Sequence, residues 1–382
     1  MRVYIESAGC EQRGIEAQRI IDYLETNKVE IVSSPQSCDY AILLTCGVDK
    51  SNEDNSIGAL ESILKRLPSS SKIILGGCLP SINPPRLARY EISGTFSPSS
   101  LENIDSILGI KIQVPFAQIE NPNYSISDNL KNNNLKNTNI ARQEYENAKR
   151  GFKIKINEGC LLSCSYCNIK KATGKLKSEP SEKIIEQYVR ARTLKEPTVM
   201  LMGGDTGAYG RDINSGLPDL LKELLHYSDG PKIFIHDFNV NWLIGDITKY
   251  DKVFSKSECL RRIKSVTFPI QSGSDRILKL MRRPYTSRGV TGALKTVKKI
   301  SPSLKIGTHV IVGFPSESEL DFQSTLDIIG ALEFDFVSCF AYSENEFTDS
   351  SKLEGKIEKE VIRQRLRMTA DLFKNKVKVF EC

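Results

Sequence analysis

The 382-residue sequence contains no long uninterrupted apolar run, few histidines and no recognisable export signal. The first absence excludes a membrane-spanning helix, which needs about 20 consecutive apolar residues. The chain opens on Met1-Arg-Val-Tyr-Ile-Glu, which enters a strand pattern directly, so we expect a cytoplasmic protein. Ten cysteines are too sparse for a disulfide scaffold in a chain of this length. They are expected to be reduced thiols or metal ligands.

Length and charge set further bounds on the protein. A chain of 382 residues predicts two domains, each with its own core. A hydrophobic content of 40% and a charged content of 26% are typical of soluble globular proteins. The net charge of +6 permits a nucleic-acid partner but does not require one.

Three cysteines with the spacing C-x3-C-x2-C are the most informative feature: Cys160, Cys164 and Cys167. A cubane iron–sulfur cluster has four irons, so three thiolates leave one iron free to bind a small molecule. Zinc sites usually pair C-x2-C with a second pair or with histidines, and the nearest histidine, His226, is far along the chain. A zinc site or a set of buried thiols remains the alternative to a cluster.

Strands and helices alternate along the first part of the chain. Strands are predicted at 3–8, 40–45 and 72–76, with helices at about 14–25 and 52–66 between them. This order predicts a doubly wound parallel α/β domain over residues 1–118. Residues 119–148 are rich in asparagine and predict a loosely ordered linker, or alternatively a specific binding arm.

From residue 149 to 345 the alternation resumes and predicts a second α/β domain. Six strands are expected at 152–156, 198–202, 232–236, 265–269, 305–312 and 336–340. Helices are expected between them at 182–194, 216–226, 274–281, 289–299 and 319–332. Six βα units predict a partial (βα)6 barrel, because a closed eight-unit barrel needs more chain. Residues 346–382 are expected to hold a basic C-terminal helix, 359–375, and a tail.

Three more cysteines follow predicted strands of the first domain: Cys10, Cys46 and Cys78. The carboxyl ends of parallel strands meet at one edge of a sheet, where ligands bind. Three thiols at that edge could therefore hold a second cluster, again with one iron unclaimed. Small apolar core cysteines are the alternative. Cys38 precedes its strand and lacks this placement, and no role is predicted for it or for Cys259, Cys339 and Cys382.

The two triplets in this order resemble the radical S-adenosylmethionine (SAM) methylthiotransferases, over nearly the whole chain. Three segments are similar to the archaeal and eukaryotic branch that acts on N6-threonylcarbamoyladenosine beside the tRNA anticodon. They are Asn157-Glu-Gly-Cys-Leu-Leu-Ser-Cys-Ser-Tyr-Cys, Ala172-Thr-Gly-Lys-Leu-Lys-Ser-Glu-Pro and Gly204-Asp-Thr-Gly-Ala-Tyr-Gly-Arg-Asp. Thr45-Cys-Gly-Val-Asp-Lys and Gly76-Gly-Cys-Leu-Pro look like the family's N-terminal motifs.

The resemblance implies a radical SAM transferase with two 4Fe-4S clusters. The Cys160 triplet would bind the cluster that cleaves SAM, and the Cys10 triplet would bind an auxiliary cluster that delivers sulfur. One SAM would methylate that sulfur and a second would yield the radical that takes hydrogen from the substrate. Implied partners are tRNA, a sulfur donor and a reductant such as flavodoxin or ferredoxin.

Residues similar to the family's SAM-binding positions follow the barrel strands. They are Tyr166, Gly203, Gly204, Asp205, Gln271, Ser272 and Gly313. All but Gly313 also have a plainer interpretation: packing for Tyr166, a helix-capping turn for Gly203–Asp205, and a polar strand end for Gln271 and Ser272. His309 is assigned no role.

The chain departs from the family pattern at several places. Asn168 follows the third cysteine where the family usually has a β-branched residue, and Thr173 stands where it has arginine. Tyr342-Ser-Glu-Asn-Glu-Phe replaces the family's Pro-Arg-Pro-Gly motif. The sequence stops at Cys382, about where the family's RNA-binding TRAM domain would begin, so we expect that domain to be lacking.

Eight basic side chains are hypothetical phosphate contacts: Lys170, Lys171, Lys175, Lys177, Arg261, Arg262, Arg282 and Arg283. Ordinary solvated charge is the alternative for each. Three other functions stay open beside tRNA methylthiolation. They are methylthiolation of a protein side chain, a radical SAM reaction of different outcome, and iron–sulfur electron transfer.

Overall fold

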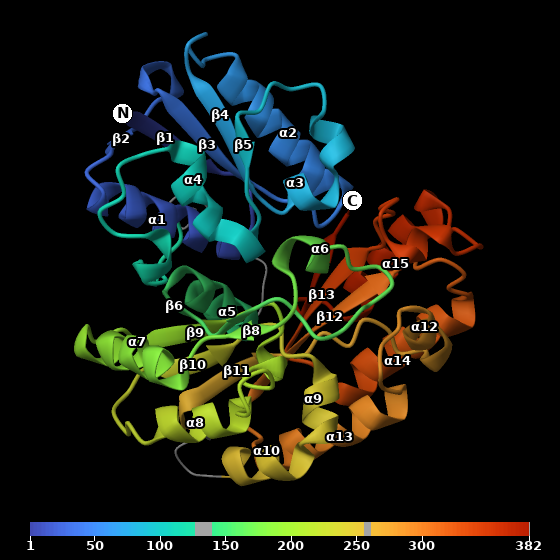
Figure 1. Cartoon of the computed structure of the whole chain (residues 1–382). Coiled ribbons are helices and arrows are strands. Elements are labelled where there is room, and N and C mark those ends of the chain that lie inside the picture. Colours follow the sequence, from blue (N-terminus) through green and yellow to red (C-terminus); the bar gives the residue numbers. More distant parts are fainter. Residues whose placement is uncertain (127–139, 256–260, 382) are drawn as a thin grey trace. The chain divides into compact units, whose positions relative to one another are not determined.

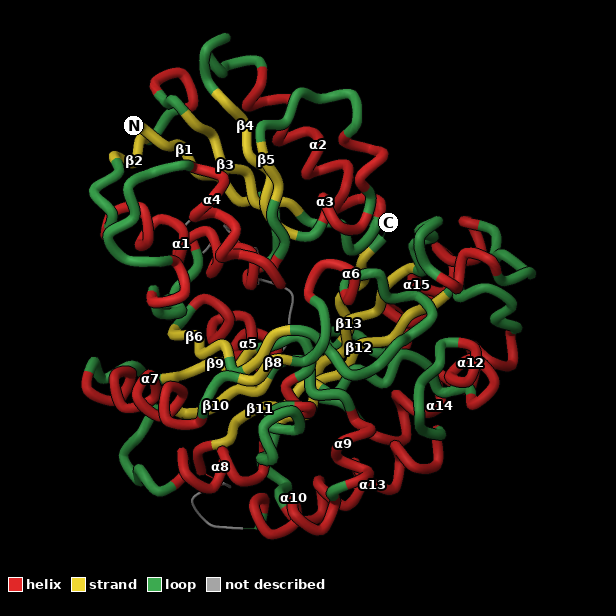
Figure 2. Tube along the Cα trace, in the orientation of Figure 1, coloured by secondary structure: helices red, strands yellow, loops and turns green. Residues whose placement is uncertain are grey.

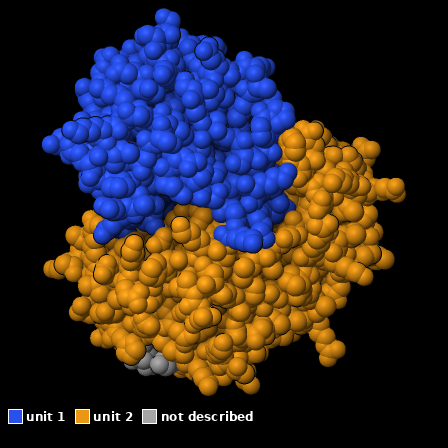
Figure 3. Space-filling model, in the orientation of Figure 1, with its two compact units in different colours: residues 1–132, 167–175 blue, residues 133–166, 176–382 orange. Residues whose placement is uncertain are grey.

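The computed structural model describes residues 1–126, 140–255 and 261–381, and the chain forms two compact units (Figure 3). The first unit comprises Met1–Asn132 together with Cys167–Lys175. The second comprises Asn133–Tyr166 and Leu176–Cys382. The short segment after the C-x3-C-x2-C spacing therefore groups with the N-terminal unit, although its sequence position lies within the predicted barrel domain.

A five-stranded parallel sheet forms the centre of the first unit (Figure 1). Its order is β2-β1-β3-β4-β5, as expected for a doubly wound domain. The strands are β1 (Arg2–Ser7), β2 (Glu30–Val32), β3 (Tyr40–Thr45), β4 (Lys72–Gly77) and β5 (Gly94–Thr95). The helices are α1 (Glu11–Thr26), α2 (Lys50–Leu64), α3 (Leu79–Ile82), α4 (Ile104–Leu108) and α6 (Lys170–Thr173).

Strand β3 is buried on both faces, which explains its continuous apolar sequence. Ile42 and Leu44 pack in a core with residues of α1 and α4. Ala41 and Leu43 pack on the opposite side with residues of α2 and α3. Because successive side chains of a strand point to opposite faces, this one strand contributes to both cores of the unit.

The second unit is built on a seven-stranded parallel sheet of order β14-β13-β12-β11-β10-β9-β6. Its strands are β6 (Phe152–Lys155), β9 (Thr198–Met202), β10 (Lys232–Ile235), β11 (Ile263–Thr267), β12 (Lys305–Val312), β13 (Phe336–Ala341) and β14 (Val377–Phe380). The first six correspond to the six predicted strands. The predicted strand count was one short, because β14 pairs in parallel with β13 where we expected a tail.

Helices connect these strands (Figure 2), and a short two-stranded ribbon includes the residues just before Cys160. The helices are α5 (Ile140–Arg150), α7 (Ser181–Thr193), α8 (Leu217–Leu225), α9 (Val240–Gly245), α10 (Ile247–Phe254), α12 (Asp275–Leu280), α13 (Ser287–Ile300), α14 (Glu319–Leu332) and α15 (Lys359–Leu372). The ribbon pairs β7 (Asn157–Glu158) with β8 (Lys177–Ser178) in antiparallel fashion. No helix among the described residues combines the length and apolar character needed to cross a bilayer.

Helix α5 occupies the last part of the predicted linker. Residues 127–139 lie outside the described residues, whereas α5 begins at Ile140 and packs on β6 and β9. Its buried positions Ala141, Tyr145 and Ala148 follow helical spacing. The Tyr145 hydroxyl lies 2.5 Å from Nδ1 of His236. The expectation of loose order was therefore wrong for residues 140–148, because the asparagine-rich stretch ends before them.

The start of α14 is held by one buried carboxylate, Asp321. It forms a capping box with Ser318, and its Oδ1 accepts a hydrogen bond of 2.5 Å from the Ser274 hydroxyl. Arg276 forms an ion pair with the other oxygen. Burial acts to raise the pKa of Asp321, but the hydrogen bonds from Arg276, Ser274 and Ser318 outweigh burial and hold that pKa well below its usual range.

Asp321→Asn is expected to destabilise the protein at neutral pH by about 1–3 kcal/mol, because hydrogen bonds to a charged group are lost. A carboxylate with a lowered pKa in the folded state contributes stability above its unfolded pKa of about 3.9 and loses it as the pH falls further. The deficit in melting temperature should therefore shrink below about pH 4. Asp327→Asn on the same helix, where the carboxylate is exposed, serves as the control. A deficit that is constant from pH 7 to about 3 would contradict the argument.

Candidate metal centres

Three cysteines lie at the carboxyl ends of three neighbouring strands of the first unit. Strands β1, β3 and β4 are adjacent and parallel, and Cys10, Cys46 and Cys78 follow them in turn. The amide of Cys78 donates to the carbonyl oxygen of Thr45 over 3.0 Å, which places the chain after β4 beside the end of β3. Cys10 is exposed and precedes the first turn of α1, whereas Cys46 and Cys78 are buried.

The Cys46 thiol experiences both of the other two cysteines. Burial raises the pKa of the Cys46 thiol far above its usual range, and Cys10 and Cys78 raise it further. Negative charge on more than one of these thiols is therefore unfavourable unless a cation lies among them. A metal–sulfide cluster supplies such a cation and deprotonates coordinating thiols. The donor set of this edge thus fits a cluster.

A buried arginine lies against this triad. Arg13, one helical turn beyond Cys10 on α1, directs Nη1 toward the Cys78 sulfur at 3.7 Å. Its Nη2 forms an ion pair of 2.8 Å with Glu16, and both side chains are almost fully buried. The carboxylate balances the guanidinium charge, so the pair adds a hydrogen-bond donor near Cys78 with little net charge.

The segment Cys167–Lys175 packs within the first unit, against the loops that carry Cys46 and Cys78. The Asn168 amide donates 2.9 Å to the carbonyl oxygen of Gly47, the residue after Cys46. Ala172 forms a small apolar cluster with Cys78 and Ile82. Asn168 is buried, and its Oδ1 lacks a hydrogen-bond partner among the described residues. Asn168, which stands where the family usually has a β-branched residue, therefore makes a specific hydrogen bond to the Cys46 loop.

Cys160 and Cys164 lie in the second unit, on the loop after β7. The Cys160 sulfur is 4.0 Å from Oδ2 of Asp205 and accepts a hydrogen bond of 3.4 Å from the Leu162 amide. The loop is anchored through Ser165, whose amide and hydroxyl donate to the carbonyl oxygens of Met281 and Leu280. Both sulfurs are partly exposed, as a ligand loop requires.

Gly203 and Gly204 allow the ligand loop to approach β9. A Cβ at Gly204 would lie 2.3 Å from the carbonyl oxygen of Gly159, next to Cys160. A Cβ at Gly203 would lie 2.0 Å from the side-chain oxygen of Asn157. The close approach of the loop thus explains why glycine stands at these two positions, which were predicted as a SAM-binding edge.

Asp205 is buried behind the same loop. Its Oδ2 accepts a hydrogen bond of 2.7 Å from the Trp242 indole and its Oδ1 one of 3.2 Å from the Asn239 amide. Burial raises the pKa of the Asp205 carboxyl, and these two donors oppose that rise. The aspartate therefore links the Cys160 loop to the start of α9.

The remaining predicted SAM-binding residues lie in different surroundings. Gln271 has φ +68°, pairs through its backbone with β12 and is only partly buried. Ser272 is buried, and its hydroxyl lies 3.3 Å from that of Thr325 on α14. Gly313 donates its amide to Glu317 over 2.7 Å, and Tyr166 packs edge-on to Phe314. Tyr166 thus has the packing contact of its plainer interpretation, and the buried Ser272 hydroxyl has a partner on α14.

Two of the eight basic residues proposed as phosphate contacts are engaged inside the second unit. Arg262 is buried and donates to the carbonyl oxygens of Leu224 and Leu225 at the end of α8. Arg283 donates to the Cys164 sulfur over 3.3 Å. The assignment of Arg262 was wrong, because its guanidinium is buried and has internal acceptors, whereas that of Arg283, which is partly exposed, stays a prediction. Lys171, Lys175 and Lys177 are exposed.

No three Cys, His, Asp or Glu side chains among the described residues are arranged to hold a single metal ion. The thiolate ligands of a four-iron cluster each bind a different iron. They therefore stand farther apart than the ligands of one ion, so clusters remain the metal groups that these cysteines suit.

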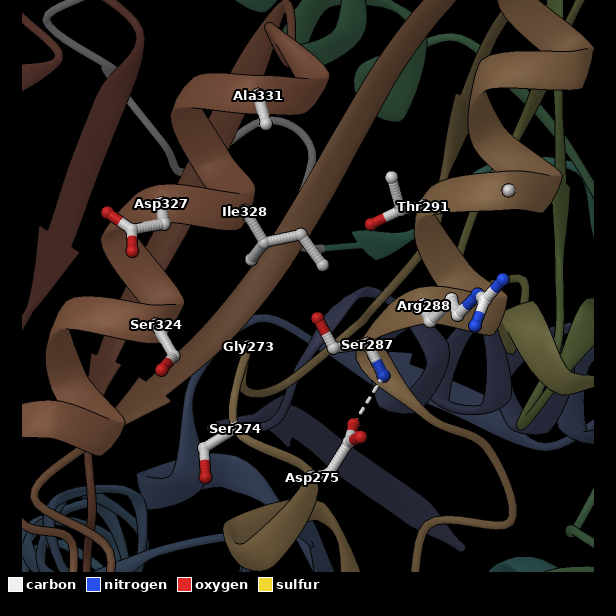
Figure 4. Close-up of a pocket in the computed structure, with 11 residues that line it drawn as sticks. Gly273, Ser274, Asp275, Ser287, Arg288, Thr291, Ser324, Asp327, Ile328 and Ala331 are labelled. Carbon is white, nitrogen blue, oxygen red and sulfur yellow. Dashed lines mark hydrogen bonds between the residues drawn. The ribbon is translucent and has the colours of Figure 1, made fainter.

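A pocket of about 760 Å³ lies between α13 and α14 in the second unit (Figure 4). Its floor is the loop Gly273–Asp275, where the Asp275 carboxylate accepts a hydrogen bond of 2.6 Å from the Ser287 amide. The rest of the lining includes small side chains such as Ser324 and Ala331, the larger Asp327 and Ile328, and an exposed arginine, Arg288. No cysteine lines it, so this pocket is not part of either candidate centre.

The comparisons with known proteins agree with the geometry. Residues 154–329 match the Radical SAM superfamily, and residues 2–94 match the uncharacterized protein family UPF0004. The threonylcarbamoyladenosine tRNA methylthiotransferase MtaB of Aquifex aeolicus is 27% identical and aligns over 100% of this chain and 90% of its own. A probable enzyme of the same name from Pyrococcus horikoshii is 29% identical over 96% of this chain and 83% of its own. The ribosomal protein uS12 methylthiotransferase RimO of Thermosipho melanesiensis is 27% identical over 97% of this chain and 83% of its own.

Solved structures share the fold. The radical SAM methyltransferase TsrM from Kitasatospora setae aligns with a TM-score of 0.63 at 11% identity, over 92% of this chain and 77% of its own. The cobalamin-dependent radical SAM enzyme OxsB aligns with a TM-score of 0.55 at 14% identity, over 99% of this chain and 58% of its own. At such identities the likeness concerns the fold alone.

Gly204→Ala should reduce iron incorporation at the Cys160 loop, because the added methyl group would displace Gly159. Overpacking of this kind costs about 1–3 kcal/mol. Iron per chain after anaerobic reconstitution and the melting temperature are the measurements. Gly292→Ala on α13 is the matched control, since a Cβ there meets nothing within 4 Å. Wild-type iron content in Gly204→Ala would show that the loop does not need this close approach.

Proposed function

We propose that this chain, which belongs to the radical SAM methylthiotransferases, inserts a methylthio group into a C–H bond of N6-threonylcarbamoyladenosine in tRNA. The observation that carries the reaction type is the second cysteine triad. Cys10, Cys46 and Cys78 follow three adjacent parallel strands, at one edge of the sheet. A second cluster held by three thiolates would keep one iron unclaimed, where the sulfur to be transferred could bind.

The cofactors follow from the family and from the two triads. The radical SAM family implies one 4Fe-4S cluster and SAM, for which Cys160, Cys164 and Cys167 are the proposed ligands. We propose Cys10, Cys46 and Cys78 as ligands of a second cluster. When bound, these groups would supply a radical that removes a substrate hydrogen and the sulfur that replaces it.

The residues of the chain hold and orient these groups. The absence of a side chain at Gly204 lets the Cys160 loop pass close to the end of β9. Asp205 lies against the Cys160 sulfur, and the Ser165 hydroxyl donates to the last carbonyl oxygen of α12. Asn168 joins the segment after Cys167 to the Cys46 loop within the first unit. Each contact restricts the position of a proposed ligand, which is what a reactive radical requires of its surroundings.

The tRNA substrate rests on the motifs and on relatives named for it. Relatives named for threonylcarbamoyladenosine in tRNA and for ribosomal protein uS12 are equally similar to this chain, at 26–29% identity. The mildly basic composition and the exposed lysines Lys171, Lys175 and Lys177 favour a polyanion over a protein side chain. Methylthiolation of a protein is the second candidate. The reaction would also need a low-potential reductant and a sulfur donor.

Mass spectrometry of tRNA nucleosides tests the substrate. The chain is expressed in a host that lacks its own threonylcarbamoyladenosine methylthiotransferase, and the 2-methylthio derivative should appear. The variant with Cys10→Ala, Cys46→Ala and Cys78→Ala should yield none. A methylthio group found on ribosomal protein uS12 and absent from tRNA would move the assignment to the protein substrate.

Iron and sulfide quantitation tests the two ligand sets. Replacing Cys10, Cys46 and Cys78 by alanine should remove about half of the iron and leave SAM cleavage to 5′-deoxyadenosine intact. Replacing Cys160, Cys164 and Cys167 should remove a similar share and abolish cleavage. Cys38→Ala and Cys339→Ala, at buried cysteines outside both triads, should retain all iron. Full iron content in the first triple variant would refute the second cluster.

A further inference from the structure

Arg283 donates directly to a proposed cluster ligand, and among the described residues no carboxylate forms an ion pair with it, although its charge also acts on the buried carboxyl of Asp205. The residue follows α12, and its Nη1 donates 3.3 Å to the Cys164 sulfur. Its Nη2 donates 3.0 Å to the carbonyl oxygen of Pro269, and its Nε donates 2.7 Å to the Tyr285 hydroxyl. All three nitrogens are thus directed by fixed acceptors, so the guanidinium has one orientation.

The charge of Arg283 has a single anionic candidate in direct contact. Arginine stays protonated in proteins, and a buried cation without an anion is costly. Among the described residues, the atoms that accept from Arg283 are a carbonyl oxygen, a hydroxyl oxygen and the sulfur of Cys164. Only the sulfur can become an anion under physiological conditions, and it does so when it ligates a metal.

The first unit provides a contrast. Arg13 also approaches a proposed ligand, at 3.7 Å from the Cys78 sulfur, but Glu16 pairs with it at 2.8 Å. The two triads therefore differ in electrostatics. One sulfur faces an arginine neutralised by a carboxylate, and the other faces an arginine whose charge is directed at the sulfur.

We propose that Arg283 is a positioning residue that raises the reduction potential of the cluster bound through Cys164. A hydrogen bond to a ligand sulfur and a nearby positive charge both favour the reduced, more negative state of an iron–sulfur cluster. The inference rests on the proposed ligand set of the second unit and does not depend on the substrate. It assigns to Arg283 a function in electron delivery, because the cluster must be reduced before SAM is cleaved.

The test is a redox titration followed by electron paramagnetic resonance, on full-length protein with Cys10→Ala, Cys46→Ala and Cys78→Ala so that one cluster is observed. Arg283→Gln should lower the midpoint potential, and Arg283→Lys, which keeps the charge, should restore part of the shift. Arg282→Gln is the matched control, because the side chain of Arg282 is exposed and forms an ion pair with Asp349. That control should titrate like the parent.

A second readout separates electron delivery from folding. With a weak reductant of fixed potential, Arg283→Gln should release 5′-deoxyadenosine at least several-fold more slowly than the parent, and a stronger reductant should recover the rate. An unchanged midpoint potential in Arg283→Gln overturns the proposal, as does an equal shift in Arg282→Gln. Loss of the cluster in both Arg283→Gln and Arg283→Lys also overturns it and leaves a structural role.

A weaker affinity for SAM in Arg283→Gln, with the potential unchanged, would assign the guanidinium to the SAM carboxylate and refute the inference. None of these measurements requires tRNA. A failure of the substrate proposal would therefore leave a shifted potential intact, and a failure of the present inference would leave the tRNA product intact.

Discussion

The candidate chemistry depends on the backbone contact between the ends of β3 and β4. Gly77 has φ +92°, and the next amide, that of Cys78, donates to the Thr45 carbonyl oxygen. A Cβ at Gly77 would lie 2.3 Å from that oxygen, so only glycine permits the approach. Because Thr45 and Gly77 are register partners, Cys46 and Cys78 leave the sheet side by side. Without this contact, the two buried thiols would have no common position.

The first unit also includes Cys167–Lys175, the segment that begins at the last cysteine of the Cys160 triplet. Asn168 donates to Gly47, and Ala172 packs on Cys78, so the chain that leaves Cys167 is fixed to the loops of the first triad. A proposed ligand of the SAM-binding cluster thus belongs to the compact unit that carries the second triad.

Local pattern accounts for most of the fold. The predicted bounds of β3, β9, β12 and α14 equal the observed ones, because each is a strongly periodic or continuously apolar segment between clear turns. Topology also placed Cys10, Cys46 and Cys78, since parallel strands bring their carboxyl ends to one edge. Helix α5 and strand β14 were missed for a physical reason. The first borders an asparagine-rich stretch, and the second, Val377–Phe380, is too short to show a period.

Most of the side chains that surround the cysteines could not be predicted from the sequence. Arg13 could have been found, since it is three residues after Cys10 and helical spacing places the two on one face. Arg283 could not, because 119 residues separate it from Cys164 and nothing in its own segment indicates a sulfur partner. Its exposed neighbour Arg282 looks the same in the sequence but pairs with Asp349. Such contacts depend on tertiary packing, so a sequence can reveal a ligand set before it reveals the charges that tune it.

The two arginines show why those charges matter. Both triads hold thiols that become anionic on binding a cluster, and a guanidinium in hydrogen-bond contact lowers the cost of that charge. Glu16 cancels most of this effect at Cys78, whereas the contacts of Arg283 leave its charge directed at Cys164. A cluster that must accept an electron gains from a cation that donates directly to its ligand sulfur, and one that must hold and release sulfur does not need it. The asymmetry between the triads is therefore consistent with a division of labour between electron acceptance and sulfur delivery.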